Sequence, residues 1–182
     1  LDWAHLPTEK YVKFNESIFY STIDHHGLSE ISRVIYSAGV SSLINQIIGA
    51  DFVIANVSGV KSLPHEGVGV GQQAFHLDGC PPGVFRALIY LNDVDHDGGP
   101  FEYVCTEDNS VRPICGSAGT LVLFDANAVK HRATPPKSRA RFALDLVILC
   151  VPSGVPRFCH SRFDLTWPVD PYLFTLPGKC FP

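Results

Sequence analysis

The chain has 182 residues, of which 46% are hydrophobic and 18% charged, so it can bury enough apolar surface to fold. This length fits one domain with a single core, and we expect residues 1–182 to form one. The 14 Lys and Arg residues are fewer than the 18 Asp and Glu residues and are not clustered, which excludes the basic surface of a nucleic-acid binder. We therefore expect a small molecule or a protein as substrate.

The six cysteines are spread along the chain without a C-x-x-C pair, so neither a zinc knuckle nor a thioredoxin-like motif is indicated. A chain of this size does not need disulfides, and we expect reduced thiols in a cytoplasmic protein. No apolar run could span a bilayer, and the start LDWAHLPTEK lacks the layout of a signal peptide. The chain starts at Leu1 and contains no Met, which suggests that segments are missing from it.

Helical periodicity marks the first quarter of the chain. Between Leu28 and Ile48 the apolar residues recur at spacings of three and four, which predicts one or two amphipathic helices. We expect this helical stretch to end at Gly49. We therefore expect residues 1–49 to form a helical N-terminal segment.

From Asp51 onward, runs of β-branched and aromatic residues alternate with clusters of Gly, Pro, Asn and Asp. The candidate strands are DFVIANVSGV, GQQAFHLD, VFRALIYLN, PFEYVC, GTLVLFD and RARFALDLVILCV. No helical pattern separates them, which argues against a doubly wound fold. We expect a mainly β protein with a cupin-like jelly roll, or double-stranded β-helix, over residues 50–151 and the N-terminal helices packed against it. Residues 152–182 are rich in proline and are expected to form an irregular extension.

His76 and Asp78 stand two residues apart in the run FHLDG. In a strand, residues i and i+2 project from the same face, with Cβ atoms roughly 7 Å apart. From there an imidazole nitrogen and a carboxylate oxygen can both reach one ion at about 2 Å. His131 follows the run GTLVLFD, so an antiparallel neighbour can bring it to the same place as the third ligand. Two His and one carboxylate leave three metal positions open, as in non-haem Fe(II) oxygenases.

An H-x-D tripeptide also occurs by chance, and Arg141 supplies the second part of the pattern. In the strand that starts there, one face is apolar: Phe142, Leu144, Leu146 and Ile148. The other face carries Arg141, Ala143, Asp145 and Val147. An Arg inside a barrel needs an anionic partner, and its planar fork suits a carboxylate. The alternative is a structural ion pair with Asp145 or Asp51, and Arg139, about 6.6 Å nearer the turn on the same face, is a rival.

Together these motifs resemble the Fe(II)/2-oxoglutarate dioxygenase superfamily over roughly Ala50 to Val151. The shared elements, in order, are FHLDG, ALIYLNDVDHDGGPFEYV, GTLVLFD, KHRA and RFAL. The phrase YLNDVDHDGGPFEYV looks most like the phytanoyl-CoA dioxygenase branch, whereas IYLN and RFAL also look like prolyl-hydroxylase relatives.

The resemblance implies that His76, Asp78 and His131 hold Fe(II), that Arg141 grips the distal carboxylate of 2-oxoglutarate, and that the Tyr90 hydroxyl donates to that carboxylate. A packed barrel tyrosine is the alternative reading of Tyr90. Arg86 falls on the same strand face as Tyr90, where it contacts substrate or caps the strand. The implied reaction couples the oxidative decarboxylation of 2-oxoglutarate by O2 to hydroxylation of a small organic substrate, with ascorbate as a candidate reductant. Asp78 favours hydroxylation over halogenation, because the family's halogenases have a small residue at this position.

Two other readings stay open at this point. The first is a metal-dependent cupin-like enzyme that does not use 2-oxoglutarate, in which Arg141 is structural. The second is a non-catalytic binding protein on a jelly-roll frame.

Overall fold

The structure is a computed structural model and describes residues 11–13, 17–66, 69 and 71–154. Within these residues the helices are α1 (His25–Ile35), α2 (Ala38–Ile48) and the short 3-10 helix η3 (Gly71–Gln73). The strands are β1 (Tyr11–Lys13), β2 (Ile18–Ser21), β3 (Asp51–Ser62), β4 (Val84–Tyr90), β5 (Phe101–Val104), β6 (Val111–Ile114), β7 (Leu121–Phe124), β8 (His131–Ala133) and β9 (Arg141–Val151).

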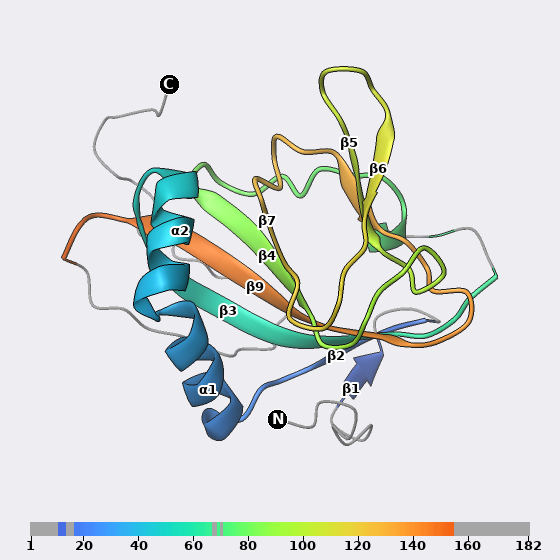
Figure 1. The fold of residues 1–182 in the computed structure, drawn as a ribbon, viewed down its shortest axis with the longest axis horizontal. Coiled ribbons are helices and arrows are strands. Elements are labelled where there is room, and N and C mark those ends of the chain that lie inside the picture. Colours follow the sequence, from blue (N-terminus) through green and yellow to red (C-terminus); the bar gives the residue numbers. More distant parts are fainter. Residues whose placement is uncertain (1–10, 14–16, 67–68, 70, 155–182) are drawn as a thin grey trace.

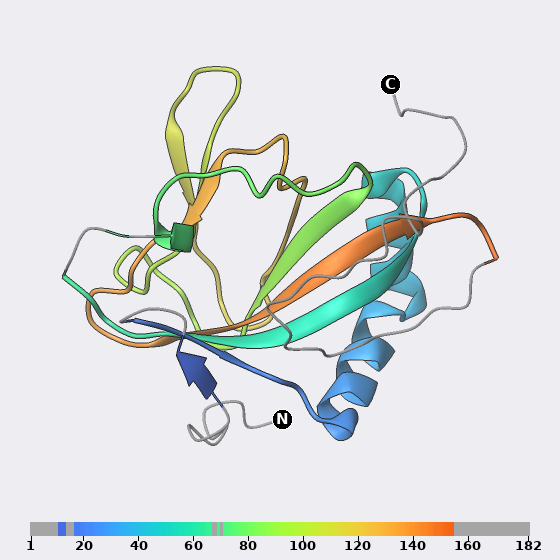
Figure 2. The same ribbon diagram turned by 180° about the vertical axis from the view of Figure 1, so that it is seen from behind.

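The strands form two antiparallel sheets. The larger sheet has six strands in the order β1-β2-β3-β9-β4-β7, and the smaller has three in the order β6-β5-β8. An isolated bridge between His76 and His131 extends the smaller sheet beyond β8. Figures 1 and 2 show α1 and α2 lying across one face of the larger sheet, with the smaller sheet on the side away from them.

The helices begin and end where their sequence provides caps. Asp24 precedes α1, and its side chain accepts a hydrogen bond of 2.8 Å from the backbone N–H of Gly27, which is one of the unpaired donors of the first turn. Gly49 ends α2 in the left-handed conformation, with φ 71°, which a residue without Cβ adopts at little cost. This confirms both the predicted helices and the predicted stop at Gly49.

The largest core cluster lies between these helices and the larger sheet. The helices contribute Ile31, Ile35, Ile44 and Ile48. The sheet contributes Phe52, Ile54, Val57, Ala87, Leu144, Leu146 and Ile148. The even-numbered positions of β9 thus face the helices, as the sequence alternation predicts, and the odd-numbered positions face the opposite side.

A β-bulge in β3 changes which of its side chains face the helices. The pairing with β9 shifts between Ile54 and Asn56, so Ile54 and Val57 both enter the helix-facing core although they are three residues apart. Beyond the bulge, Val60 and Ser62 point to the other face, where a pocket lies. β3 therefore contributes side chains both to the helix-facing core and to the pocket wall.

The mainly β architecture is confirmed, but the expected layout of the N-terminal segment is wrong. Residues 1–49 are not only helical, because β2 pairs with β3 and adds β1 at the edge of the larger sheet. The candidate strand GQQAFHLD is also wrong in most of its length, since it forms η3 and a single bridge at His76. The expected extension at residues 152–182 lies almost wholly outside the described residues.

The described cysteines Cys80, Cys105, Cys115 and Cys150 are free thiols, and Cys159 and Cys180 lie outside the described residues. Burial raises the pKa of the Cys150 and Cys80 thiols above the ordinary value, which favours the protonated form. In the part of the chain that the structure describes, no helix is long and apolar enough to cross a membrane.

The core predicts the cost of truncating Leu146, which is 0% exposed in β9. We expect Leu146→Ala to lower the free energy of unfolding by about 2–5 kcal/mol, because it leaves a cavity between the helices and the sheet. Ile47→Ala is the control, since Ile47 is 59% exposed on α2, and it should change the stability by less than about 0.5 kcal/mol. Urea unfolding followed by circular dichroism measures both, and equal losses would contradict this placement of the core.

Candidate metal centre

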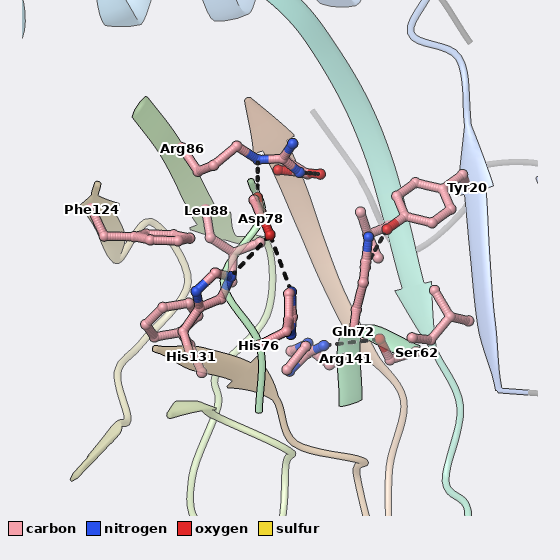
Figure 3. Close-up of a pocket in the computed structure, with 15 residues that line it drawn as sticks. Tyr20, Ser62, Gln72, His76, Asp78, Arg86, Leu88, Phe124, His131 and Arg141 are labelled. Carbon is pink, nitrogen blue, oxygen red and sulfur yellow. Dashed lines mark hydrogen bonds and ion pairs between the residues drawn. The ribbon is translucent and has the colours of Figure 1, made fainter. Parts of the chain in front are cut away.

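The side chains of His76, Asp78 and His131 converge on one point. Their ligand atoms all lie within 4.8 Å of one another. The Oδ1 atom of Asp78 is 3.1 Å from Nε2 of His76 and 3.6 Å from Nε2 of His131. Figure 3 shows Asp78 between the two imidazole rings on one side and Arg86 on the other. The structure thus brings together the three residues that the sequence singles out as ligands.

Backbone hydrogen bonds hold the two ligand-bearing segments side by side. His76 and His131 exchange a reciprocal pair of N–H to C=O bonds, each 3.0 Å long. The N–H of Asp78 donates to the carbonyl of Ala126, also at 3.0 Å, in the loop after β7. Gly79 follows with φ +65°, a conformation that favours glycine and turns the chain away directly after the ligand. The FHLDG run therefore makes a short bridge and a turn rather than a regular strand.

The imidazole rings are oriented by their inner nitrogens. Nδ1 of His76 lies 2.8 Å from the carbonyl oxygen of Ala74, and Nδ1 of His131 lies 2.8 Å from that of Val129. Because a carbonyl oxygen can only accept, Nδ1 carries the proton in both rings. The Nε2 atom of each ring faces Asp78 and is the nitrogen that can bind a metal through its lone pair. This is the orientation in which histidine binds a metal.

Aromatic side chains enclose His131. Its ring stacks on Phe101 with a centroid distance of 5.4 Å and packs at a tilt against Phe124 at 4.6 Å. Burial lowers the pKa of His131 below its ordinary value, so the neutral ring that a metal requires is favoured. The environment of His131 therefore favours metal binding over protonation.

The second oxygen of Asp78 faces a buried ion pair. Oδ2 of Asp78 is 3.8 Å from Nε of Arg86, and Nη2 of Arg86 is 2.5 Å from Oδ2 of Asp145. Burial raises the pKa of Asp145, and the positive charge of Arg86 opposes that shift. Burial by itself would lower the pKa of Arg86, but the carboxylates of Asp145 and Asp78 outweigh it and raise that pKa. The sequence analysis expects Arg86 to contact substrate or to cap its strand, whereas the structure pairs it with Asp145, a partner that depends on strand register.

Arg141 lies buried in the wall of the same pocket, with 3% of its surface exposed. Its guanidinium donates to the carbonyl of Gly99 and, at 3.0 Å, to the hydroxyl of Ser62. Its Nε is buried without a hydrogen-bond partner, and no ion pair with a described carboxylate is formed. Burial lowers its pKa below the ordinary value, as expected for a cation that lacks an anionic neighbour.

The residues considered as partners or as a rival of Arg141 each contact another residue instead. Asp145 is engaged by Arg86, and Asp51 accepts a hydrogen bond from Asn45 at 3.1 Å. Arg139 pairs with Asp95 at 2.8 Å, and its side chain is 48% exposed at the surface. The structural ion pairs considered for Arg141 are therefore not formed, and its rival Arg139 does not line the pocket.

Tyr90 is placed differently from its expected role as a carboxylate donor. The side chain is 0% exposed and does not line the pocket. Its hydroxyl donates to the carbonyl of Ile114 at 2.8 Å and accepts from the N–H of Phe101 at 2.9 Å. The hydroxyl thus joins the two sheets both as a donor and as an acceptor. This arrangement matches the alternative reading of Tyr90 as a packed barrel tyrosine.

Tyr20 is a pocket residue that the sequence did not point out. It lies on β2, is 6% exposed, and its hydroxyl donates to the side-chain oxygen of Gln72. Burial raises its pKa above the ordinary value, so it remains a neutral hydrogen-bonding group. The only available signal was the alternation of Ile18 and Tyr20, which is too short to identify a strand by itself.

Two imidazoles and one carboxylate on one side of a pocket form a suitable ligand set for a first-row divalent metal. The pocket is partly open to solvent, and its walls come from both sheets. Apart from the triad, its charged residues are Arg86, Asp145 and Arg141. A metal held by the triad would keep open positions toward this space, which Arg141 also lines.

No model of a known protein family matches the chain, and no curated protein matches it in sequence. Solved structures do match. An oxidoreductase of the 2OG-Fe(II) oxygenase family from Burkholderia pseudomallei is 18% identical, with a TM-score of 0.59 over 80% of this chain and 73% of that one. The non-haem α-ketoglutarate-dependent epimerase SnoN of nogalamycin biosynthesis is 15% identical, with a TM-score of 0.61 over 84% and 71%. A prolyl-4-hydroxylase from Pseudomonas putida is 21% identical, with a TM-score of 0.55 over 79% and 78%.

At these identities the likeness is one of fold, and the chain has the mainly β fold of 2-oxoglutarate and Fe(II) oxygenases. The His-Asp-His set and the pocket beside it fit Fe(II) and 2-oxoglutarate. The matched proteins include an epimerase as well as a hydroxylase, so the fold is compatible with more than one reaction outcome.

The geometry of the triad predicts the effect of removing one ligand. We expect His131→Ala to weaken Mn(II) binding by more than about 100-fold. Substituting a residue that only hydrogen-bonds a metal ligand already lowers the metal affinity by about 10- to 100-fold, and losing the ligand itself lowers it further. His96→Ala, which changes an exposed histidine in a loop, should leave the affinity unchanged. Isothermal titration calorimetry on the metal-free proteins measures both. Retention of wild-type affinity in His131→Ala would exclude the triad as the metal site.

Proposed function

We propose that the chain is a non-haem Fe(II) oxygenase that decarboxylates 2-oxoglutarate and hydroxylates a small organic substrate. In this proposal His76, Asp78 and His131 hold the iron and Arg141 binds the distal carboxylate of 2-oxoglutarate. The core of the fold would be a jelly roll, in which the bridge at His76 continues the smaller sheet.

The buried, unpaired charge of Arg141 is the observation that carries the proposal. An arginine that is only 3% exposed and has an unsatisfied Nε is costly unless an anion joins it. It lines the same pocket as an open metal triad, so the missing anion and the metal would be neighbours. A dicarboxylate with one end on the metal and the other on Arg141 satisfies both sites at once. A metal enzyme without 2-oxoglutarate leaves the burial of Arg141 unexplained.

The backbone around Arg141 fixes its position. Gly99 has φ +73°, and a Cβ there would lie 2.5 Å from the carbonyl oxygen of Thr134, so only glycine brings its own carbonyl to the guanidinium. Ser62 on β3 lies directly opposite Arg141 in the β3–β9 ladder and contacts a second guanidinium nitrogen. The fork is thereby held before any ligand arrives, which lowers the entropy lost on binding.

When bound, Fe(II) would activate O2 for the coupled oxidation of 2-oxoglutarate and substrate, yielding succinate, CO2 and the hydroxylated product. The chain itself supplies positions and surroundings. Phe101 and Phe124 shield His131 from water, and Ile18, Val60 and Leu88 give the pocket apolar walls. Such walls exclude water from the reacting groups and suit an uncharged part of a substrate.

We further propose that the chain is closest in type to the phytanoyl-CoA dioxygenase branch, on the basis of the phrase YLNDVDHDGGPFEYV. Two residues of this phrase make hydrogen bonds to the start of β9. Asn92 accepts a hydrogen bond from the N–H of Phe142 at 2.7 Å, and Gly99 accepts from Arg141. The phrase therefore helps to fix the start of β9, where the proposed 2-oxoglutarate anchor stands.

The proposed function is tested by product analysis. Protein loaded with Fe(II) and ascorbate under air should convert 2-oxoglutarate to succinate, slowly without substrate and faster when a suitable small molecule is added. The His76→Ala protein serves as the control and should release no succinate above the metal-only background. If the wild-type protein binds Fe(II) but neither binds nor consumes 2-oxoglutarate, the oxygenase proposal fails.

Arg141→Ala should weaken the binding of 2-oxoglutarate to the Mn(II)-loaded protein by roughly 10- to 100-fold, because a charge-assisted pair contributes about 1.5–3 kcal/mol. Arg139→Ala removes an equivalent side chain at the surface and should leave the affinity unchanged. Calorimetry gives both affinities, and undiminished Mn(II) binding shows that each variant is folded. If instead Tyr90→Phe weakens 2-oxoglutarate binding and Arg141→Ala does not, the anchor is assigned to the wrong residue.

A further inference from the structure

The guanidinium of Arg86 lies between the carboxylates of Asp145 and Asp78 and is closer to that of Asp145. Its Nη2 is 2.5 Å from Oδ2 of Asp145, whereas its Nε is 3.8 Å from Oδ2 of Asp78. The first contact is a direct charge-assisted hydrogen bond, and the second is too long to be one. Figure 3 shows Arg86 on the side of Asp78 that faces away from the two imidazoles.

The two oxygens of Asp78 therefore have different surroundings. Oδ1 faces the histidine nitrogens at 3.1 Å and 3.6 Å, where a metal would bind. Oδ2 faces Arg86, whose charge lies near enough to orient the carboxylate but makes no direct bond to it. The carboxylate thus presents one oxygen to the proposed metal position while the other is attracted, loosely, to a cation behind it.

Strand pairing keeps Arg86 in this position. In the β4–β9 ladder Leu88 lies opposite Asp145 and Arg86 opposite Val147, so Arg86 and Asp145 are diagonal neighbours on the pocket face. Both side chains are largely buried, with 18% and 17% of their surfaces exposed. Neither can turn to solvent without losing its partner inside the protein.

Without Asp145, the guanidinium of Arg86 would pair with the carboxylate of Asp78. A guanidinium fork pairs with a carboxylate through two parallel hydrogen bonds, and a buried cation without a partner seeks the nearest anion. Among the described residues, the other carboxylate within ion-pair distance of Arg86 is Asp78, with Oδ2 already 3.8 Å from Nε. A direct pair would draw the carboxylate away from the histidines and compete with the metal for it.

We propose that Asp145 is a positioning residue that holds Arg86 back from Asp78, so that Asp78 stays free to bind the metal while Arg86 orients its outer oxygen. This inference rests on the proposed function, because it takes the triad as a metal site. It assigns the buried Arg86–Asp145 pair a role in metal affinity, apart from any part it plays in folding.

A double-mutant cycle on metal affinity tests the proposal, with Mn(II) binding to the metal-free protein measured by calorimetry for four proteins. Asp145→Asn should weaken Mn(II) binding roughly tenfold or more, the size of effect known for residues behind metal ligands. Arg86→Gln alone should change the affinity much less. The double variant Asp145→Asn/Arg86→Gln should regain most of the loss, because the competing guanidinium is gone.

The cycle separates this role from two simpler ones. If Asp145 acted only through its charge at a distance, the effects of the two substitutions would be additive, and additivity overturns the proposal. If the pair were merely structural, removing Arg86 as well would not restore the affinity, and the absence of recovery also overturns it. Recovery in the double variant beyond additivity supports it.

A matched control comes from the Arg132–Glu102 pair, whose side chains meet at 2.6 Å beside a metal ligand in sequence. Glu102→Gln removes the ion-pair partner of that arginine in the same way, but neither Arg132 nor Glu102 lines the pocket, so the Mn(II) affinity should be unchanged. Thermal unfolding is recorded for every variant, and Asp145→Ser takes the place of Asp145→Asn if the latter does not fold. Failure of the wild-type protein to bind Mn(II) would overturn the metal site itself, whereas normal wild-type binding with an additive cycle overturns only this inference.

Discussion

The long antiparallel pairing of β3 with β9 runs from Asp51 opposite Val151 to Ser62 opposite Arg141, and the rest of the molecule is arranged around it. Because side chains alternate between the faces of a strand, this one register decides which residues meet the helices and which meet the pocket. A slip by one residue would turn Arg141 toward the helices and bring Leu144 into the pocket. The core and the candidate site therefore depend on the same set of backbone hydrogen bonds.

Much of this follows from local patterns in the sequence. The alternation in β9 separates an apolar face from a face with Arg141 and Asp145, and the structure has both as predicted. The i, i+2 spacing of His76 and Asp78 and the position of His131 were sufficient to predict that the three side chains meet. The prediction for β9 succeeds because it rests on strand periodicity, which is a local property of the chain. His76 and Asp78 meet as predicted, but through a bridge and a turn rather than along the regular strand on which their spacing was interpreted.

What the sequence could not supply is the pairing between segments. The Arg86–Asp145 contact depends on how β4 and β9 are aligned, and the joining of β2 to β3 depends on a strand too short to recognise. Tyr90 illustrates the same limit, because alternation places it on the inner face but cannot show that its hydroxyl is engaged by the backbone of the smaller sheet. In each case the deciding partner lies far away in the sequence, where no local pattern records it.

The bridge between His76 and His131 has a thermodynamic consequence. The ligands belong to two segments separated by more than fifty residues, which few backbone hydrogen bonds join near the site: the reciprocal pair of His76 and His131 and the bond from Asp78 to Ala126. An ion held by all three side chains would act as a removable cross-link that closes a long loop only in the native state. The conformational stability of the protein would then rise with the concentration of free metal, so that a chelator would act on it as a mild denaturant.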